Sequence, residues 1–238
     1  MICEIYGKGS CSVALVACIH GDEQIWINVI EKIKLEVPKE ITLVVIIANE
    51  KAKTENTRFI QSDLNRVFPG ALNGDYESQL AFILKNILQT FDYVIDLHST
   101  EAITEMFAIF TKNEAFRLLD FIPLKNIVAI PKILAKGKSL IDNVSCGVSI
   151  EVNDNEDIDQ LKQMLNETLN NIVKQIQTEI NKDYYHVFDN CKEDIAFENF
   201  VEYKKEFIPI LYGAKSYKDI TCLKAKKCAK EELVALLK

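Results

Sequence analysis

Three polar residues stand at the ends of apolar runs and have the types that bind zinc. His20 and Glu23 follow the apolar run 13–19, and His98 follows a second, mostly apolar run, 92–97. A catalytic zinc ion takes three protein ligands of these types and leaves a fourth position open. A His-x-x-Glu pair alone is common by chance, but two such strand ends together predict a metal site.

A zinc hydrolase also needs a base that accepts a proton from the attacking water. The best candidate is Glu151, near the end of the apolar run 147–152, although a solvated strand end would also suit a glutamate. Asp96 shares one face of its predicted strand with His98, because residues two apart point to the same side. It either orients a zinc ligand or pairs with a loop residue. The remaining histidine, His186, lies in the C-terminal part of the chain, and we expect it to be structural or on the surface.

The elements that must position these residues alternate between strands and helices, which is typical of an α/β protein. Short runs rich in apolar and β-branched residues predict buried strands at 13–19, 41–48, 92–97, 106–110, 127–130 and 147–152. Apolar residues at helical spacing predict helices at 25–35, 75–89 (with Asp75 as the N-cap), 114–121 and 158–180. Ligands of open α/β sheets bind at the carboxyl ends of the strands, where the candidate residues would lie.

Two segments depart from this alternation. Residues 49–73 are mostly polar and form a long connection that is typical of a functional or disordered loop, and they contain Arg58, Asn65 and Arg66. From residue 183 onward, short aromatic and β-branched runs predict a small β subdomain. Its expected strands are 184–188, 195–201, 207–212 and 220–223, followed by a helix at 230–237. We therefore expect a catalytic domain at 1–182 and a β-rich C-terminal domain at 183–238.

The composition argues against several classes of protein. The 238 residues include 28 Lys and Arg against 35 Asp and Glu, a net charge of −7, so we expect no nucleic-acid partner. We interpret Lys224, Lys226, Lys227 and Lys230 as the solvated start of a helix. The seven cysteines are an odd number without a Cys-x-x-Cys pair, which argues against a disulfide framework or a thiolate zinc site.

The sequence also predicts the location of the protein. No apolar stretch approaches the ~20 residues of a membrane helix. The N-terminus does not resemble a signal peptide, so we expect a cytoplasmic protein that does not bind membranes. The sequence does not decide whether the protein forms a homo-oligomer.

Four motifs occur in the order and spacing of one known family: HGDE at 20–23, RFIQSDLNRVFPG at 58–70, DLHST at 96–100 and IEV at 150–152. They resemble the succinylglutamate desuccinylase/aspartoacylase family, a branch of the zinc carboxypeptidase clan. The Asp-Leu-Asn-Arg block that follows an Arg is the most specific of them. The resemblance implies the fold class α/β, with a mixed, largely parallel sheet flanked by helices, as in zinc carboxypeptidases, and a small C-terminal β subdomain.

The resemblance also implies a role for each candidate residue. One Zn²⁺ per chain would be held by His20, Glu23 and His98. Glu151 would be the general base that later protonates the leaving amine. Arg58 would polarise the scissile carbonyl and stabilise the oxyanion of the tetrahedral intermediate.

In the same comparison, Asn65 and Arg66 would bind the carboxylate of the substrate, because a planar guanidinium suits two parallel hydrogen bonds. Aspartoacylases carry a further Arg shortly before the catalytic Glu, which binds a second carboxylate. Ile141 stands near that position here, with Lys136 and Lys138 as the nearest cations. We therefore expect N-acetylaspartate to be no better a substrate than a neutral N-acyl amino acid, unless one of these lysines takes over the role.

These residues predict a zinc-dependent hydrolase that cleaves an amide bond next to a free carboxylate. We expect an N-acyl amino acid deacylase with a small-molecule carboxylate as substrate, and a metallocarboxypeptidase acting on short peptides is the alternative enzyme. A metal- or ligand-binding protein without turnover is the alternative outside enzymes. The complete set of Glu151, Arg58 and Arg66 argues against that last class, because a binding protein has no need of a base.

Overall fold

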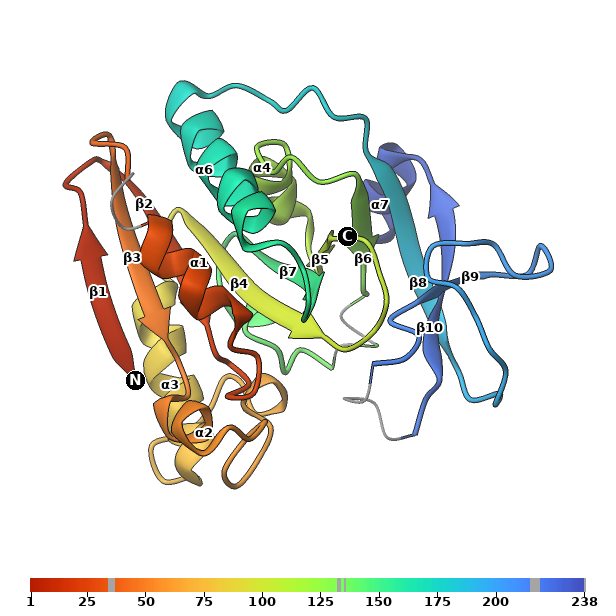
Figure 1. Cartoon of the computed structure of the whole chain (residues 1–238), viewed down its shortest axis with the longest axis horizontal. Helices are drawn as coiled ribbons and strands as arrows, with labels where there is room; N and C mark the ends of the chain where they lie inside the picture. Colours follow the sequence, from red (N-terminus) through yellow and green to blue (C-terminus); the bar gives the residue numbers. More distant parts are fainter. Residues whose placement is uncertain (34–36, 132–133, 135, 215–218, 238) are drawn as a thin grey trace.

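The computed structural model describes residues 1–33, 37–131, 134, 136–214 and 219–237, and in this part of the chain one ten-stranded sheet forms the centre (Figure 1). Its order is β1-β3-β2-β4-β7-β5-β6-β8-β10-β9. The strands are β1 (Ile2–Tyr6), β2 (Cys11–Ala17), β3 (Ile41–Ile47), β4 (Tyr93–Thr100), β5 (Phe107–Phe110), β6 (Asn126–Ala129), β7 (Gly147–Asn153), β8 (Asp183–Cys191), β9 (Ile208–Ile210) and β10 (Cys222–Cys228). The α-helices are α1 (Ile25–Ile33), α2 (Glu50–Glu55), α3 (Tyr76–Leu88), α4 (Phe116–Leu119), α6 (Ile158–Lys174) and α7 (Lys230–Leu236). Short 3-10 turns are η1 (Leu64–Arg66), η2 (Asn113–Ala115) and η3 (Ile141–Asn143).

The sheet is mixed and largely parallel, as predicted. β3, β2, β4 and β7 are parallel neighbours, and β5, β6 and β8 form a second parallel group. β5 runs antiparallel to β7, and antiparallel pairs form both ends of the sheet: β1 with β3, and β10 with β8 and β9. The carboxyl ends of β2, β4 and β7 therefore lie at one edge of the sheet, where the candidate residues are located.

Helices cover both faces of the sheet, so the central strands are buried on both sides. Along β2, Val13 and Leu15 face the core layer that contains α1 and α6, whereas Ala14 faces the layer that contains α3. α1 and α6 also pack against each other (Figure 1). Burial on both faces explains why the strands appear in the sequence as continuous apolar runs rather than as alternating patterns.

The predicted helix 158–180 is too long. α6 ends at Lys174, because Gln175 adopts the left-handed conformation, with φ of 54°, and its N–H donates to two carbonyl groups of the preceding turn. Ile176 and Ile180, which the periodicity places on the apolar stripe, lie beyond the helix and are 52% and 41% exposed. The apolar spacing thus continues past the point where the backbone leaves the helix.

The segment 49–73 is not only a loop, because it contains α2 and η1. The sequence of α2, Glu-Lys-Ala-Lys-Thr-Glu, has no apolar stripe and gives no helical period. Its ends define it instead: the side chain of Asn49 accepts a hydrogen bond from the Ala52 backbone N–H, and Asn56 ends the helix in the left-handed conformation. The edge strand β1 was likewise not predicted.

The C-terminal strands continue the same sheet, since β8 pairs in parallel with β6. The predicted strand 195–201 is wrong, because these residues form no strand. Lys224, Lys226 and Lys227 lie in β10 rather than at the start of a helix. The predicted boundary between 1–182 and 183–238 stays a prediction.

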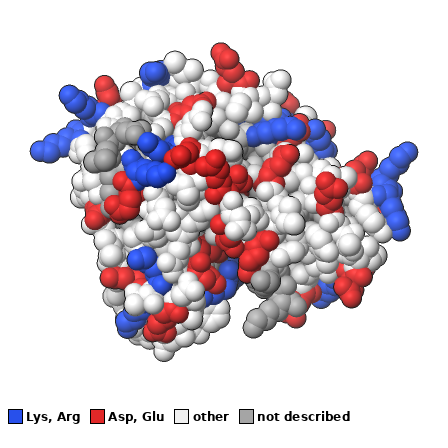
Figure 2. All heavy atoms as spheres, in the orientation of Figure 1, with Lys and Arg blue, Asp and Glu red and all other residues white. Residues whose placement is uncertain are grey.

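The surface is of mixed charge. The chain carries a net charge of −7, and acidic and basic side chains are interspersed on the face shown in Figure 2. Within the described ranges, no helix has both the length and the apolar character that crossing a membrane requires.

Candidate active site

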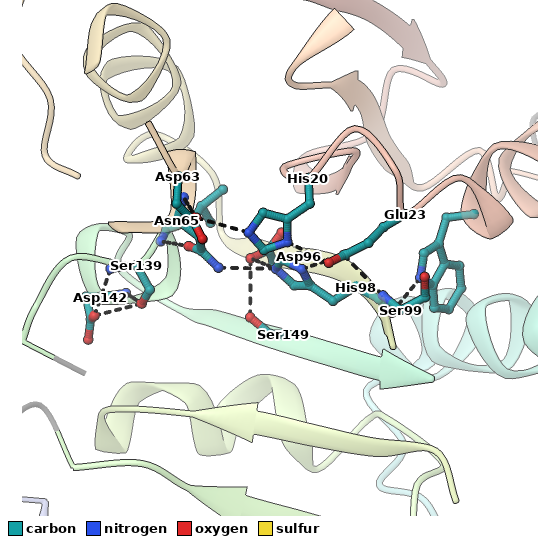
Figure 3. A network of polar contacts seen from close by, with 12 residues as sticks. His20, Glu23, Asp63, Asn65, Asp96, His98, Ser99, Ser139, Asp142 and Ser149 are labelled. Carbon is teal, nitrogen blue, oxygen red and sulfur yellow. Dashed lines mark hydrogen bonds and ion pairs between the residues drawn. The ribbon is translucent and has the colours of Figure 1, made fainter. Parts of the chain in front are cut away.

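His20, Glu23 and His98 meet at one edge of the sheet. His20 and Glu23 stand between β2 and α1, and His98 lies near the end of β4, the neighbour of β2. The Nδ1 atoms of His20 and His98 lie 2.6 Å and 2.8 Å from the two carboxylate oxygens of Glu23 (Figure 3). All three residues are buried, and one ligand atom from each lies within 4.8 Å of the others. The structure thus brings the three predicted ligands together.

A carboxylate contacts the outer nitrogen of each imidazole. Asp63 Oδ1 lies 3.1 Å from His20 Nε2, and Asp96 Oδ2 lies 2.8 Å from His98 Nε2. Of the two roles left open for Asp96, contact with the histidine is the one observed. Such carboxylates fix the ring orientation of metal-ligating histidines, and here the Nδ1 atoms are the ones that face inward. The sequence did not single out Asp63, although it stands in the Asp-Leu-Asn-Arg block.

The charges around the two histidines favour a cation at this place. Burial disfavours a charged imidazole, but Asp96 and Glu23 outweigh it and raise the pKa of His98 well above its usual value. Burial is likewise outweighed at His20, where Glu23 and Asp63 raise the pKa. Burial alone would raise the pKa of Glu23, yet the two histidines hold it below its usual range. Two imidazoles and a carboxylate that together stabilise positive charge fit the donor set of Zn²⁺.

Arg58 reaches the same group from the segment between β3 and α3. Its Nε and Nη2 donate to Asp63 Oδ2 at 3.1 Å and 3.0 Å, and its Nη1 lies 3.6 Å from Glu23 Oε1. Asp63 therefore contacts Arg58 with one oxygen and His20 with the other. A guanidinium fixed in this way can stabilise negative charge that develops on a neighbouring oxygen.

Glu77, in the first turn of α3, holds the backbone that carries Arg58. It is fully buried. Its Oε1 accepts hydrogen bonds from Asn49 Nδ2 and the Ile60 N–H at 3.0 Å and 2.7 Å. Its Oε2 accepts from the N–H groups of Gln61 and Ser62 at 3.0 Å and 3.2 Å. One buried carboxylate thus satisfies three consecutive backbone donors. This role could not be predicted from the sequence, because the contacts form only in the folded chain.

Asn65 and Arg66 lie on η1 and line the same cavity as the histidines. Asn65 Oδ1 accepts a hydrogen bond from the Leu140 N–H at 2.8 Å, and its Nδ2 lies 3.3 Å from His98 Nε2. Arg66 Nη1 donates to the carbonyl oxygen of Asn65 at 2.8 Å. Both residues are therefore next to the predicted ligands, and their binding of a carboxylate stays a prediction.

Glu151 enters the site from β7. In the parallel pairing of β4 with β7 it stands opposite His98, so the register of the sheet places the predicted base beside a predicted ligand. Burial raises the pKa of Glu151 to about 7. A carboxyl group with such a pKa can both accept and release a proton near neutral pH.

A cavity of about 590 Å³ connects these groups. All seven predicted site residues line it: His20, Glu23, Arg58, Asn65, Arg66, His98 and Glu151. The remainder of its lining is rich in apolar side chains: Ile109, Ile130, Leu134, Ile141, Val187, Leu211, Ile220 and Leu223. His186 is not among the described residues that line the cavity.

Known proteins are similar to this chain in sequence. A family model described as the succinylglutamate desuccinylase/aspartoacylase catalytic domain matches residues 10–133. A probable aspartoacylase from Acaryochloris marina is 31% identical over 119 residues, which cover 44% of this chain and 40% of that protein. The match therefore spans less than half of the length of this relative. The residues matched by the family model end before Glu151.

Solved structures extend the similarity to the whole fold. Murine aminoacylase 3 has a TM-score of 0.76 at 16% identity, covering 93% of this chain and 96% of that chain. The succinylglutamate desuccinylase from Chromobacterium violaceum has a TM-score of 0.71 at 17% identity, covering 94% and 86%. At these identities the likeness shows the fold alone, and the family model supplies the sequence match. The chain belongs to the succinylglutamate desuccinylase/aspartoacylase family.

Proposed function

We propose that the protein is a zinc-dependent deacylase that hydrolyses the amide bond of an N-acyl amino acid next to a free carboxylate. The observation that carries this proposal is that the group of His20, Glu23 and His98 lines the same cavity as Glu151. Metal ligands, a carboxylate base and guanidinium groups in one cavity are the parts that amide hydrolysis requires. Membership of a family of deacylases supports the same chemistry.

One zinc ion per chain would be held by His20, Glu23 and His98, with Asp63 and Asp96 orienting the imidazoles. A zinc ion bound there supplies Lewis acidity toward the substrate carbonyl and the attacking water. Three protein ligands leave the further position that a catalytic zinc site requires.

The other residues move the proton and hold the substrate. Glu151 accepts a proton from the attacking water while the water oxygen forms a bond to the carbonyl carbon. Arg58 donates a hydrogen bond to the carbonyl oxygen as that oxygen gains negative charge. When the C–N bond breaks, Glu151 returns the proton to the leaving nitrogen, which gives a carboxylic acid and an amine. Arg66, with Asn65, anchors the carboxylate of the substrate through hydrogen bonds.

Turnover by the zinc-loaded protein tests this proposal. N-acyl amino acids and dipeptides are incubated with the protein, and the products are followed by mass spectrometry. We expect cleavage of N-acyl amino acids with a free carboxylate. Their amides and methyl esters should be cleaved poorly, because they are uncharged and cannot form an ion pair with Arg66. Cleavage of dipeptides alone would indicate a metallocarboxypeptidase, and binding without cleavage would indicate a non-catalytic protein.

A further inference from the structure

We propose that the cavity selects N-acyl amino acids that carry an uncharged, apolar group in addition to the anchored carboxylate. This inference rests on the proposed function and adds the class of substrate to it. It follows from the part of the cavity lining that consists of apolar side chains.

Apolar side chains from three strands form this part of the lining, here called the apolar wall. Ile109 in β5, Val187 in β8 and Leu223 in β10 belong to one hydrophobic cluster, together with Ile141 and Leu211. All five also line the cavity. Each is at most 9% exposed, so a substrate group that enters here replaces water with hydrocarbon contacts.

The turn that carries Ile141 is held in place on two sides. The backbone N–H of Leu140 donates to Asn65 Oδ1 at 2.8 Å, which connects the turn to the residues around the proposed zinc ligands. Lys112 Nζ donates to two carbonyl oxygens of the same turn. Ile141 itself is 2% exposed. The wall therefore presents a fixed apolar side chain at this position.

Among the described residues that line the cavity, none of the cations belongs to the hydrophobic cluster that forms the apolar wall. Arg58 is bound to Asp63, and Arg66 lies on η1 beside the proposed zinc ligands. Lys136 and Lys138 are exposed to solvent. A second carboxylate against the apolar wall would lose its hydration without gaining an ion pair there, which is strongly unfavourable. A hydrocarbon group gains from the same burial.

A neutral polar side chain, that of Thr111, also lines the cavity. Thr111 directly follows β5, lines the cavity and is 6% exposed. Its Oγ1 has no hydrogen-bond partner in the described part of the chain. A hydroxyl group can make one hydrogen bond to a neutral ligand atom, but it cannot balance a charge.

The first experiment compares substrates that differ in the polarity of one group. The zinc-loaded protein is assayed with N-acetyl-L-leucine, N-acetyl-L-asparagine and N-acetyl-L-aspartate, whose side chains have the same heavy-atom branching. We expect kcat/KM for the leucine compound to exceed that for the aspartate compound by about 10-fold or more, with asparagine between them.

A second series locates the apolar group on the substrate. N-acetyl-, N-butanoyl- and N-hexanoylglycine differ only in the length of the acyl chain. A rise of kcat/KM along this series assigns the apolar wall to the acyl group. A flat series, with leucine still preferred over aspartate, assigns the wall to the amino-acid side chain.

Two variants connect the preference to the wall. Ile141→Arg adds a cation and should lower the ratio of leucine to aspartate turnover by about 10-fold. Leu223→Ala widens the wall and should raise turnover of N-acetyl-L-phenylalanine relative to N-acetyl-L-leucine. Leu169→Ala removes a buried leucine from α6 in the other core layer, so it is the matched control that should cost stability without changing either ratio.

A preference of the wild-type protein for N-acetyl-L-aspartate over N-acetyl-L-leucine, together with a flat acyl series, overturns the inference. If Lys136→Ala or Lys138→Ala abolishes that preference, a lysine supplies the missing charge. The inference is also overturned if the folded variants keep the wild-type ratios of leucine to aspartate turnover and of phenylalanine to leucine turnover. If Ile141→Arg does not fold, the test rests on the phenylalanine-to-leucine ratio of Leu223→Ala and on the leucine-to-aspartate ratio of the wild type. Turnover that favours aspartate leaves the proposed function standing, whereas no turnover of any N-acyl amino acid overturns both.

Discussion

The contacts of their ring nitrogens distinguish His20 and His98 from His186. His20 and His98 each face Glu23 with Nδ1 and an aspartate with Nε2. His186 is a residue of β8 and does not belong to the described lining of the cavity. At His186 burial lowers the pKa, whereas the carboxylates around the other two histidines raise it.

We therefore expect His98→Ala to lose most of the zinc and His186→Ala to keep it. Removal of His98 leaves two protein ligands, fewer than the three that a catalytic zinc site uses. Both variants are purified with zinc, dialysed together and analysed for metal by elemental analysis. Full zinc occupancy in His98→Ala would show that the metal is held elsewhere.

Glu151→Gln should keep the fold and the zinc but lose turnover. The amide has nearly the shape of the carboxylate but cannot accept a proton from water, and the loss of a general base commonly costs about 10²–10⁴-fold in rate. The variant is compared with the wild type in kcat at equal zinc content. An unchanged kcat would assign the base to another residue.

The pH profile provides a separate test of Glu151. A base must be deprotonated to act, so kcat/KM should fall as the pH drops through the pKa of this group. Burial raises that pKa to about 7, and a bound zinc ion lowers it through its positive charge. We expect the acidic limb of the profile to have its midpoint above the usual 4.5 of a glutamate. A midpoint at or below the usual value would show that burial does not control the pKa of Glu151.

The grouping of His20, Glu23 and His98, the proposed metal ligands, could be predicted from the sequence because each follows an apolar run that becomes a parallel strand. Glu151 could be found for the same reason. Asp63 could not be assigned to His20 in this way, because the two are 43 positions apart and meet only through the path of the segment between β3 and α3. The role of Glu77 depends in the same way on where that segment folds back onto α3.

At the scale of elements, the segment between β3 and α3 is held by polar contacts as well as by the buried side chains of Leu64 and Phe68. Its residues Ile60, Gln61 and Ser62 donate their N–H groups to Glu77. Arg58 lies two positions before Ile60, and Asn65 lies three positions after Ser62. The position of two candidate site residues therefore depends on one carboxylate in α3.

Glu77→Gln should lower both stability and activity. The amide replaces an oxygen that accepts two hydrogen bonds by an NH₂ group, which leaves buried N–H donors unpaired at a cost of about 1–3 kcal/mol. The free energy of unfolding is measured by denaturant titration, and kcat/KM is measured on the folded variant. Glu55→Gln, on the exposed end of α2, is the matched control, and equal stability of the two variants would contradict this role.

Elements with an apolar stripe were predicted, and those without one were missed. α3 and α6 show their periods in the sequence, whereas α2 depends on capping by Asn49 and has no stripe. The end of α6 was placed too late because Ile176 and Ile180 keep the helical spacing after the backbone has left the helix at Gln175. Such a termination depends on the conformation of one residue, which hydrophobic periodicity does not report.

At the scale of the whole molecule, the sheet connects the two predicted domains. β8 pairs with β6, and Val187 and Leu223 from the C-terminal strands join the hydrophobic cluster that contains Ile109 and Ile141. The apolar wall of the cavity is thus formed by residues from both sides of position 182. The α/β class and the mixed sheet could be predicted from the alternation of elements and from the family resemblance. The continuity of the sheet could not, because strand order is not encoded in local patterns.

We expect a chain shortened to residues 1–182 to fold poorly. The truncation exposes the hydrogen-bonding edge of β6 and part of a buried cluster, and unpaired edges of this kind promote aggregation. Solubility and thermal unfolding of the shortened and full chains are compared. A soluble 1–182 chain with a cooperative unfolding transition would show that the predicted domain boundary separates independent units.

The single tryptophan of the chain connects the hydrophobic core to His98. Trp26 is fully buried in α1, and its indole Nε1 donates to the carbonyl oxygen of His98 at 2.9 Å. Indole emission responds to the polarity and hydrogen bonding around the ring, and here one of those bonds goes to the backbone of a proposed zinc ligand. The protein therefore carries a built-in fluorophore at the site, and zinc uptake could be followed by its intrinsic fluorescence without a label or a substrate.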